Sequence, residues 1–185
     1  MRFVKSGLQL IGTHAVMSII QFVLMPSLFS ILENNQIYQW FIGLLYIAIF
    51  WFIIYVDMSG KGLDDCRRGN YAMYNGFITG LVASVPPVLL YILAMTYSPG
   101  PNQVNWFTTA LRVWLIPYTK IFVTFDSSSS LRHLMPDIAI IPIVLFVLGA
   151  GISYIDGSRK RKKILDIIDK SDALRAEKSK VNPNI

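Results

Sequence analysis

The chain has 185 residues, of which 54% are hydrophobic and only 15% charged; its net charge is +6 and its mean hydropathy is +0.49. Because soluble domains average about 25% charged residues, this composition excludes an ordinary soluble globular protein and indicates a bilayer as solvent. A single cysteine, Cys66, excludes an internal disulfide and a cysteine-based zinc cluster.

Four long stretches carry no charged residue, and each is long enough for a membrane helix, which needs about 20 apolar residues. We therefore predict an all-α integral membrane protein with four transmembrane helices, at about 8–31, 39–56, 76–97 and 136–155. They form a membrane domain over 1–157, followed by a basic cytoplasmic tail over 158–185.

The basic residues predict which ends of these helices face the cytoplasm. With a cytoplasmic N-terminus, 14 of the 17 lysines and arginines fall on the inner side, which follows the positive-inside rule. We therefore predict a multi-pass plasma-membrane protein with both termini cytoplasmic.

The first apolar stretch predicts an anchored helix, because it exceeds the apolar core of about 7–15 residues in a cleaved signal peptide. It carries a polar stripe, since His14, Ser18 and Gln21 recur at helical spacing and should turn inward. An intramembrane histidine is a candidate proton carrier or ligand. The alternative is a structural histidine that bonds a neighbouring helix.

Residues 57–76 form the densest polar stretch between predicted spans, and Gly60, Gly62 and Gly69 let it turn sharply. Its alternating acids and bases favour a solvated inner loop, with a partner or phosphate site as the alternative. The GKGLDD run lacks the pattern of a nucleotide-binding loop.

The third predicted span presents small residues on one face, and this pattern predicts close helix packing in lipid. Pro86 and Pro87 remove two backbone donors near its middle, so we also expect a kink. The packing and kink residues are Gly76, Gly80, Ala83, Ser84, Pro86 and Pro87. A broken helix can form a transport site only opposite a second interrupted helix, for which Pro142 and Pro26 are weak candidates.

The segment at about 104–125 is long enough to span but carries Arg112 and Lys120. We predict an outer interfacial helix broken near Pro117, with Trp106, Trp114 and Tyr118 at the headgroup level. A re-entrant hairpin is the alternative. The predicted outer headgroup contacts are Arg112, Lys120 and Arg132.

The tail opens with five consecutive cations, which are predicted to contact anionic inner-leaflet lipids: Arg159, Lys160, Arg161, Lys162 and Lys163. Beyond them the pattern predicts a short amphipathic helix, followed by a disordered end. Ile168 and Leu174 lie on its apolar side, which could rest on the leaflet or dock on a partner.

Four features carry a family resemblance: a charged loop ending CRRGNYAMYNG, the run FITGLVASVPPVLLYILAM, a tryptophan-bearing outer segment, and the closing GAGISYIDGSRKRKK. Over about residues 60–165 the chain resembles small four-helix membrane proteins of Gram-positive bacteria that lack an assigned activity. The resemblance implies a four-span bacterial plasma-membrane protein and carries no functional residue with it.

The sequence favours a non-catalytic membrane subunit or interaction protein that binds a protein partner or forms a homo-oligomer, with no cofactor, metal or nucleic acid. A small oligomeric transporter or channel is the alternative, with His14, Gln21, Pro86 and Pro87 lining its path. A lipid-modifying enzyme ranks third, because Arg112, Lys120, Arg132 and His133 could gather phosphate headgroups, but no catalytic spacing of acid and histidine accompanies them.

Overall fold

The computed structural model describes residues 2–31, 35–97, 104–118, 121 and 134–181, and in this part of the chain all regular structure is helical. The elements, in chain order, are α1 (Arg2–Ile31), α2 (Gln36–Arg67), α3 (Asn75–Ala83), α4 (Val85–Thr96), α5 (Trp106–Trp114), the 3₁₀ turn η1 (Ile116–Tyr118) and α7 (Leu134–Val181).

Three helices are long and apolar enough to cross a membrane: Val4–Leu24 within α1, Gln36–Arg67, and Ile138–Arg175 within α7. A bent pair, Asn75–Ala83 with Val85–Thr96, makes a fourth span if the two halves are counted as one. Large apolar side chains face outward on these helices, as Phe41, Phe52 and Ile152 do. The prediction of an all-α protein with several membrane spans is confirmed at this level.

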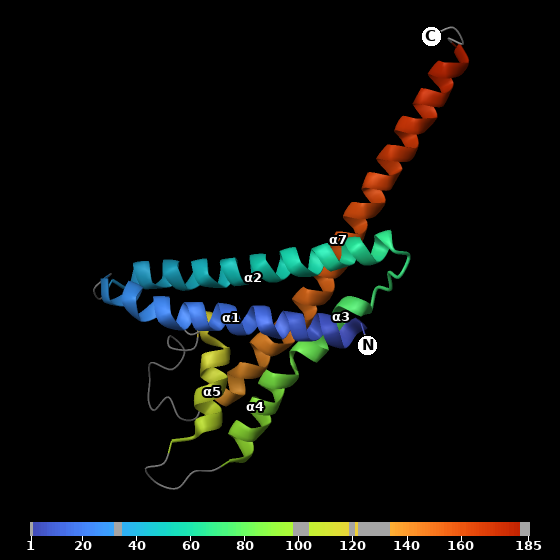
Figure 1. Cartoon of the computed structure of the whole chain (residues 1–185). Helices are drawn as coiled ribbons and strands as arrows, with labels where there is room; N and C mark the ends of the chain where they lie inside the picture. The colour runs from blue at the N-terminus through green and yellow to red at the C-terminus, as the bar shows by residue number, and fades with distance from the viewer. Residues whose placement is uncertain (1, 32–34, 98–103, 119–120, 122–133, 182–185) are drawn as a thin grey trace.

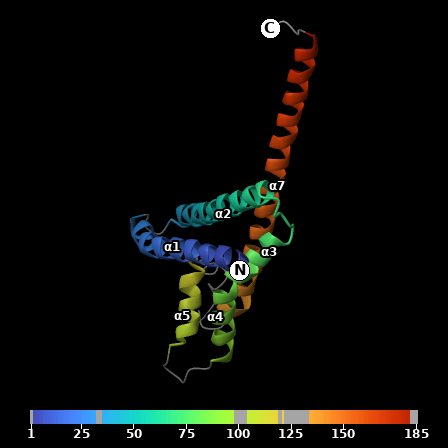
Figure 2. The same ribbon diagram turned by 45° about the vertical axis from the view of Figure 1, so that its right-hand side comes forward.

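Helices α1 and α2 lie side by side and antiparallel, and α7 crosses them at a steep angle (Figure 1). Helices α3 and α4 pack along the lower part of α7, and α5 packs against α4 and α1, while the C-terminal part of α7 projects beyond the bundle. The second view shows the same projection (Figure 2). The start of α1, the end of α2 and the start of α3 therefore meet near the point where α7 leaves the bundle.

The contact between α2 and α7 depends on glycine, because the backbones approach too closely for a side chain. An added Cβ at Gly62 would lie 2.0 Å from the Tyr154 carbonyl oxygen, and one at Gly157 would lie 1.9 Å from the Ser59 carbonyl oxygen. In lipid, such close approach supplies the van der Waals contact that holds helices together.

Small residues of α3 make the corresponding contact on another side of α7. A Cβ on Gly76 would lie 2.5 Å from the Tyr154 Cβ, and one on Gly80 would lie 3.1 Å from the Ala150 Cβ. Ala83, Ser84 and Pro87 are also buried on this side. The small-residue face of the third predicted span therefore lies against α7 rather than against lipid.

The third span is interrupted at Ser84, which caps both α3 and α4. Pro86 and Pro87 lie in the first turn of α4, where a missing N–H is tolerated. The two halves meet at 44°. The break therefore falls where the sequence places its two missing backbone donors.

The predicted loop over 57–76 is wrong in its first half, because α2 continues without interruption to Arg67. Gly60 and Gly62 are helical, and only Gly69 adopts a left-handed backbone conformation, with φ of 69°. Gly62 serves close packing against α7, a role that local sequence does not distinguish from turn formation.

The segment after α4 also differs from the prediction. The helix ends at Trp114, before Pro117 as expected, but Tyr118 is buried in the core and Trp114 packs against it. Only Trp106 remains mostly exposed. Tyr118 therefore belongs to the bundle interior and Trp114 lies half-buried against it, whereas the prediction had both rings facing the headgroups.

The tail does not form a separate short helix. Helix α7 runs for 48 residues and carries the basic cluster on its continuous backbone, with Pro142 inside it. The predicted disordered end, residues 179–185, is wrong in its first part, because α7 continues to Val181. Residues 182–185 lie outside the described residues, as do Lys120, Arg132, His133 and the serine run at 127–130.

Candidate functional site

The polar stripe of α1 turns inward, as the spacing indicates. His14, Ser18 and Gln21 are buried, with exposed fractions of 5%, 3% and 0%. The Ser18 hydroxyl lies 3.4 Å from His14 Nδ1 and donates a 3.1 Å hydrogen bond to the Trp114 carbonyl oxygen. The stripe therefore connects α1 to the end of α5.

Three aromatic rings surround His14. The Trp114 indole stacks on the imidazole at 4.7 Å with an interplanar angle of 11°, while Phe50 and Phe146 contact it edge-on at 4.8 and 5.6 Å. These rings come from α5, α2 and α7. The imidazole thus sits in a mainly aromatic cage, with no carboxylate among its ring contacts or hydrogen bonds in the described structure.

Gln21 is held less completely. Its Nε2 donates a 3.4 Å hydrogen bond to the Tyr46 carbonyl oxygen, while its buried Oε1 makes no hydrogen bond to the described residues. Gln21 therefore joins α1 to α2 but does not lie in the cage around His14.

A cavity of about 10 Å³ adjoins the histidine and lies where the α3–α4 break, η1 and α7 meet. It is lined by Ser84 and Pro87 at the α3–α4 break, Pro142 of α7, Tyr118 of η1, and His14. This volume is enough for about one water molecule. The structure therefore brings Pro142 opposite the break in the third span, a pairing that spacing along the chain could not establish.

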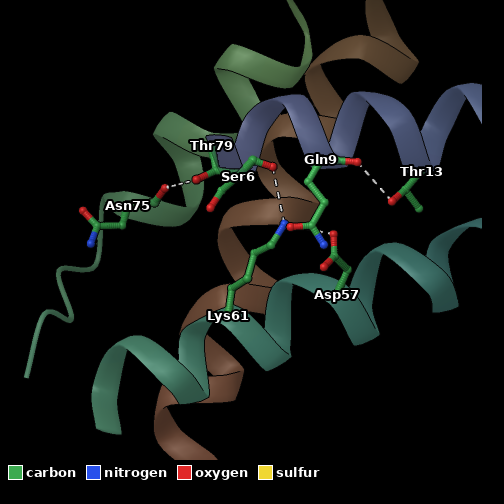
Figure 3. A network of polar contacts seen from close by, with 7 residues as sticks. All are labelled: Ser6, Gln9, Thr13, Asp57, Lys61, Asn75 and Thr79. Atoms are coloured by element: carbon green, nitrogen blue, oxygen red, sulfur yellow. Dashed lines mark hydrogen bonds and ion pairs between the residues drawn. The ribbon is translucent and has the colours of Figure 1, made fainter. Parts of the chain in front are cut away.

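A second polar cluster ties the start of α1 to the end of α2 (Figure 3). Lys61 Nζ forms a 3.0 Å ion pair with Asp57, one helical turn earlier, and donates a 3.4 Å hydrogen bond to the Ser6 carbonyl oxygen. The same view shows Thr79 of α3 donating to the Asn75 carbonyl oxygen, 2.9 Å away. The Lys61–Ser6 bond joins α2 to α1, whereas the Thr79–Asn75 bond lies within α3, whose first turns lie beside them in this view.

Tyr154 of α7 completes this end of the bundle. Its hydroxyl donates to Asp65 at 2.9 Å and accepts from Asn75 Nδ2 at 3.3 Å, while Tyr71 stacks on its ring at 5.7 Å. Sequence reasoning missed this network, because Asp65 and Tyr154 lie 89 residues apart. A tyrosine in a helix that also carries glycines offers no local signal for it.

The basic cluster is only partly available for lipid contact. Lys160 forms a 3.2 Å ion pair with Asp156 and donates to the Tyr55 hydroxyl, which itself donates to Asp156 at 2.6 Å. Lys162 lies 5.8 Å from the centre of the Tyr71 ring. Arg159 and Lys163 are exposed, whereas Arg161 is half-buried. Lys160 therefore helps to fix α7 against α2, and Lys162 contacts the link between α2 and α3.

Of the predicted outer headgroup contacts, only Arg112 lies within the described residues, and it is half-buried. Among the residues described, no three histidine, cysteine or acidic side chains gather in a way that could hold a metal ion. Within the described ranges, no acid pairs with His14. The described site therefore consists of hydrogen-bonded and aromatic contacts rather than a recognisable catalytic arrangement.

Comparison with protein-family models, curated proteins and solved structures found no match to this chain. The resemblance to small four-helix proteins of Gram-positive bacteria thus stays a prediction. The fold is that of a multi-pass α-helical membrane protein. Its function has to be inferred from the contacts described above.

Proposed function

We propose that this protein is a non-catalytic subunit of a membrane complex and that the projecting part of α7 binds a helix of another protein. The observation that carries the proposal is an apolar seam on that projection. Ile164, Ile167, Ser171 and Leu174 follow one another at spacings of three and four, which is the repeat of a coiled-coil contact. Ile167 and Leu174 are 67% and 59% exposed.

The charges beside the seam indicate the character of the partner. Lys163 and Lys170 occupy one flank of the repeat, and Arg175 occupies the other. The carboxylates of Asp166 and Asp169 lie toward the opposite side of the helix by the same spacing. A partner helix with acidic residues beside its own apolar seam would complement these cations.

A second copy of this chain fits the seam poorly. Parallel pairing would set Lys170 against Arg175, and antiparallel pairing would set Lys163 against Lys170. Like charges at these flanking positions destabilise the pair. A bilayer surface is also a weaker occupant, because residues 159–175 contain no aromatic anchor.

The arrangement of helix ends supports the proposed orientation. Ser6, Lys61 and Tyr154 lie at one end of the bundle, joined by the contacts described above, and the basic cluster begins just beyond Tyr154. By the positive-inside rule this end faces the cytoplasm of a plasma membrane, with both termini inside. The seam would then be available to cytoplasmic or membrane-anchored partners.

A small oligomeric transporter is the second candidate, and one specific observation favours it. Pro142, inside the continuous helix α7, lines the same cavity as His14 and the break at Ser84, so a broken helix and a helix proline meet at one point, as part of the paired arrangement of midplane transport sites. The aromatic cage and the volume of about 10 Å³ enclose this point, so the monomer presents a site without a route.

The test is gentle purification of the tagged chain from its own membranes, followed by mass measurement of the intact complex. We expect a protein of different sequence at fixed stoichiometry, lost from the Ile167→Ser/Leu174→Ser variant and from Lys163→Glu/Lys170→Glu. Leu165→Ser is the matched control, since Leu165 is exposed on the same helix but lies outside the seam.

Three results would contradict the proposal. They are a complex containing only copies of this chain, a partner retained equally by seam and control variants, and a purified protein that retains only lipid. The first would favour the oligomeric transporter and direct attention to His14.

A further inference from the structure

We infer that the cavity beside His14 is a binding site for one water molecule, held jointly by the Ser84 hydroxyl and the Tyr118 hydroxyl. Both residues line the cavity. Both are more than nine-tenths buried, with exposed fractions of 3% and 6%. The site lies apart from the seam of α7 and does not depend on the proposed function.

Two buried polar groups beside the cavity lack a hydrogen-bond partner among the described residues. Ser84 Oγ and the Tyr118 hydroxyl make no hydrogen bond of ordinary geometry to the described residues. Trp51 is a polar neighbour of Tyr118, but an indole N–H only donates and leaves the tyrosine proton without an acceptor. A buried polar group without a partner is destabilising, so native proteins usually supply it with one.

The cavity meets the requirements for a water molecule. Its volume of about 10 Å³ is near the lower limit for a single water, and such a water needs two to four polar partners. Ser84 and Tyr118 provide two, and the His14 ring lies on the same wall. Among the described residues no carboxylate lines the cavity, and the volume is too small for an organic ligand, so water fits better than a metal cation or a substrate.

The break in the third span explains why a water belongs here. Pro87 has no N–H to offer the carbonyl of Ala83, and both residues line the cavity. Broken helices in membranes are tolerated where side chains or ordered waters satisfy the backbone groups set free. A bound water would thus serve both the break and the two hydroxyls.

The experiment is a double-mutant cycle in the full-length protein, measured as the midpoint temperature of unfolding in detergent. If the two hydroxyls share a water, Ser84→Ala and Tyr118→Phe should each lower the midpoint by about 2–4 °C. The double variant should fall little further than either single variant, because one deletion already releases the water. The expected result is therefore strong coupling between residues that make no direct hydrogen bond.

The control pair is Ser153→Ala with Tyr118→Phe. Ser153 is a buried serine of α7 whose hydroxyl already donates to the Gly149 carbonyl oxygen at 2.7 Å, so its effect should add to that of Tyr118→Phe. If the cavity is dry, Ser84→Ala and Tyr118→Phe should not lower the midpoint, since removing an unpaired buried hydroxyl leaves stability unchanged or raises it.

Either an unchanged or raised midpoint in Ser84→Ala, or additive effects of Ser84→Ala and Tyr118→Phe, would overturn the inference. A cation in place of water has its own signature: the midpoint of the native protein would rise when sodium replaces choline at constant ionic strength. We expect no such dependence, and finding one would also overturn the assignment to water.

Discussion

Replacing Gly62 by alanine should destabilise the protein strongly, because this glycine lets α2 touch the backbone of α7. The new methyl group would lie 2.0 Å from the Tyr154 carbonyl oxygen, whereas real Cβ atoms essentially never approach within 3.0 Å. The helices must therefore separate by about 1 Å, an overpacking that typically costs about 1–3 kcal/mol and sometimes more. The displacement also strains the 2.9 Å hydrogen bond between Tyr154 and Asp65, three residues further along α2.

Gly60→Ala is the matched control, two residues earlier in the same helix. An added Cβ there meets nothing within 4 Å, so only the intrinsic helix preference remains, which favours alanine by about 1 kcal/mol. The change in the free energy of unfolding should thus have opposite signs in the two variants. At about 2–4 °C per kcal/mol for a chain of this size, Gly62→Ala should lower the unfolding midpoint in detergent by several degrees, while Gly60→Ala raises it slightly. Equal midpoints for the two variants would refute close α2–α7 packing.

Two further outcomes follow from the described contacts. Tyr154→Phe should lower the free energy of unfolding by about 1–2 kcal/mol, because its hydroxyl both donates to Asp65 and accepts from Asn75. Chemical denaturation of the two proteins measures this difference. An unchanged value would show that the network does not stabilise the fold. The free energy of unfolding of His14→Phe should lie within about 1.5 kcal/mol of the native value, since a ring still fills the cage beside Trp114. His14→Ala should lose about 3–5 kcal/mol. Similar losses in both variants would show that the imidazole nitrogens, not the ring, stabilise the fold.

Composition and helical periodicity predicted the membrane-spanning helices and the buried faces of α1 and α3. Charge-free stretches marked the spanning helices because burying charge in hydrocarbon is unfavourable wherever it occurs along a chain. The inward stripe of His14, Ser18 and Gln21 followed from the helical repeat alone. The small residues of α3 likewise predicted a packing face before its partner, α7, was known.

Other features depend on contacts between distant residues and left no local trace. The glycine-rich sequence around Gly62 is typical of a turn. Gly62 instead packs against Tyr154, more than ninety positions later in the sequence. Trp114 carries the signature of a headgroup anchor, and the histidine that stacks on it lies in α1. The cavity needs Ser84, Tyr118 and Pro142 from three separate elements, so no spacing along the chain could have revealed it.

The central claim, that the chain crosses the membrane several times and presents the end of α2 and the projecting part of α7 on the inner side, can be tested with a membrane-impermeant thiol reagent. Cys66 is the only cysteine, so the native protein reports the end of α2 directly. In a Cys66→Ser background, Lys170→Cys reports the projection and Val104→Cys reports the chain just before α5. Both positions are exposed. The account predicts that intact cells label only Val104→Cys, and that Cys66 and Lys170→Cys react after the membrane is permeabilised. Labelling of Cys66 and Lys170→Cys in intact cells, or equal labelling of all three positions, would contradict it.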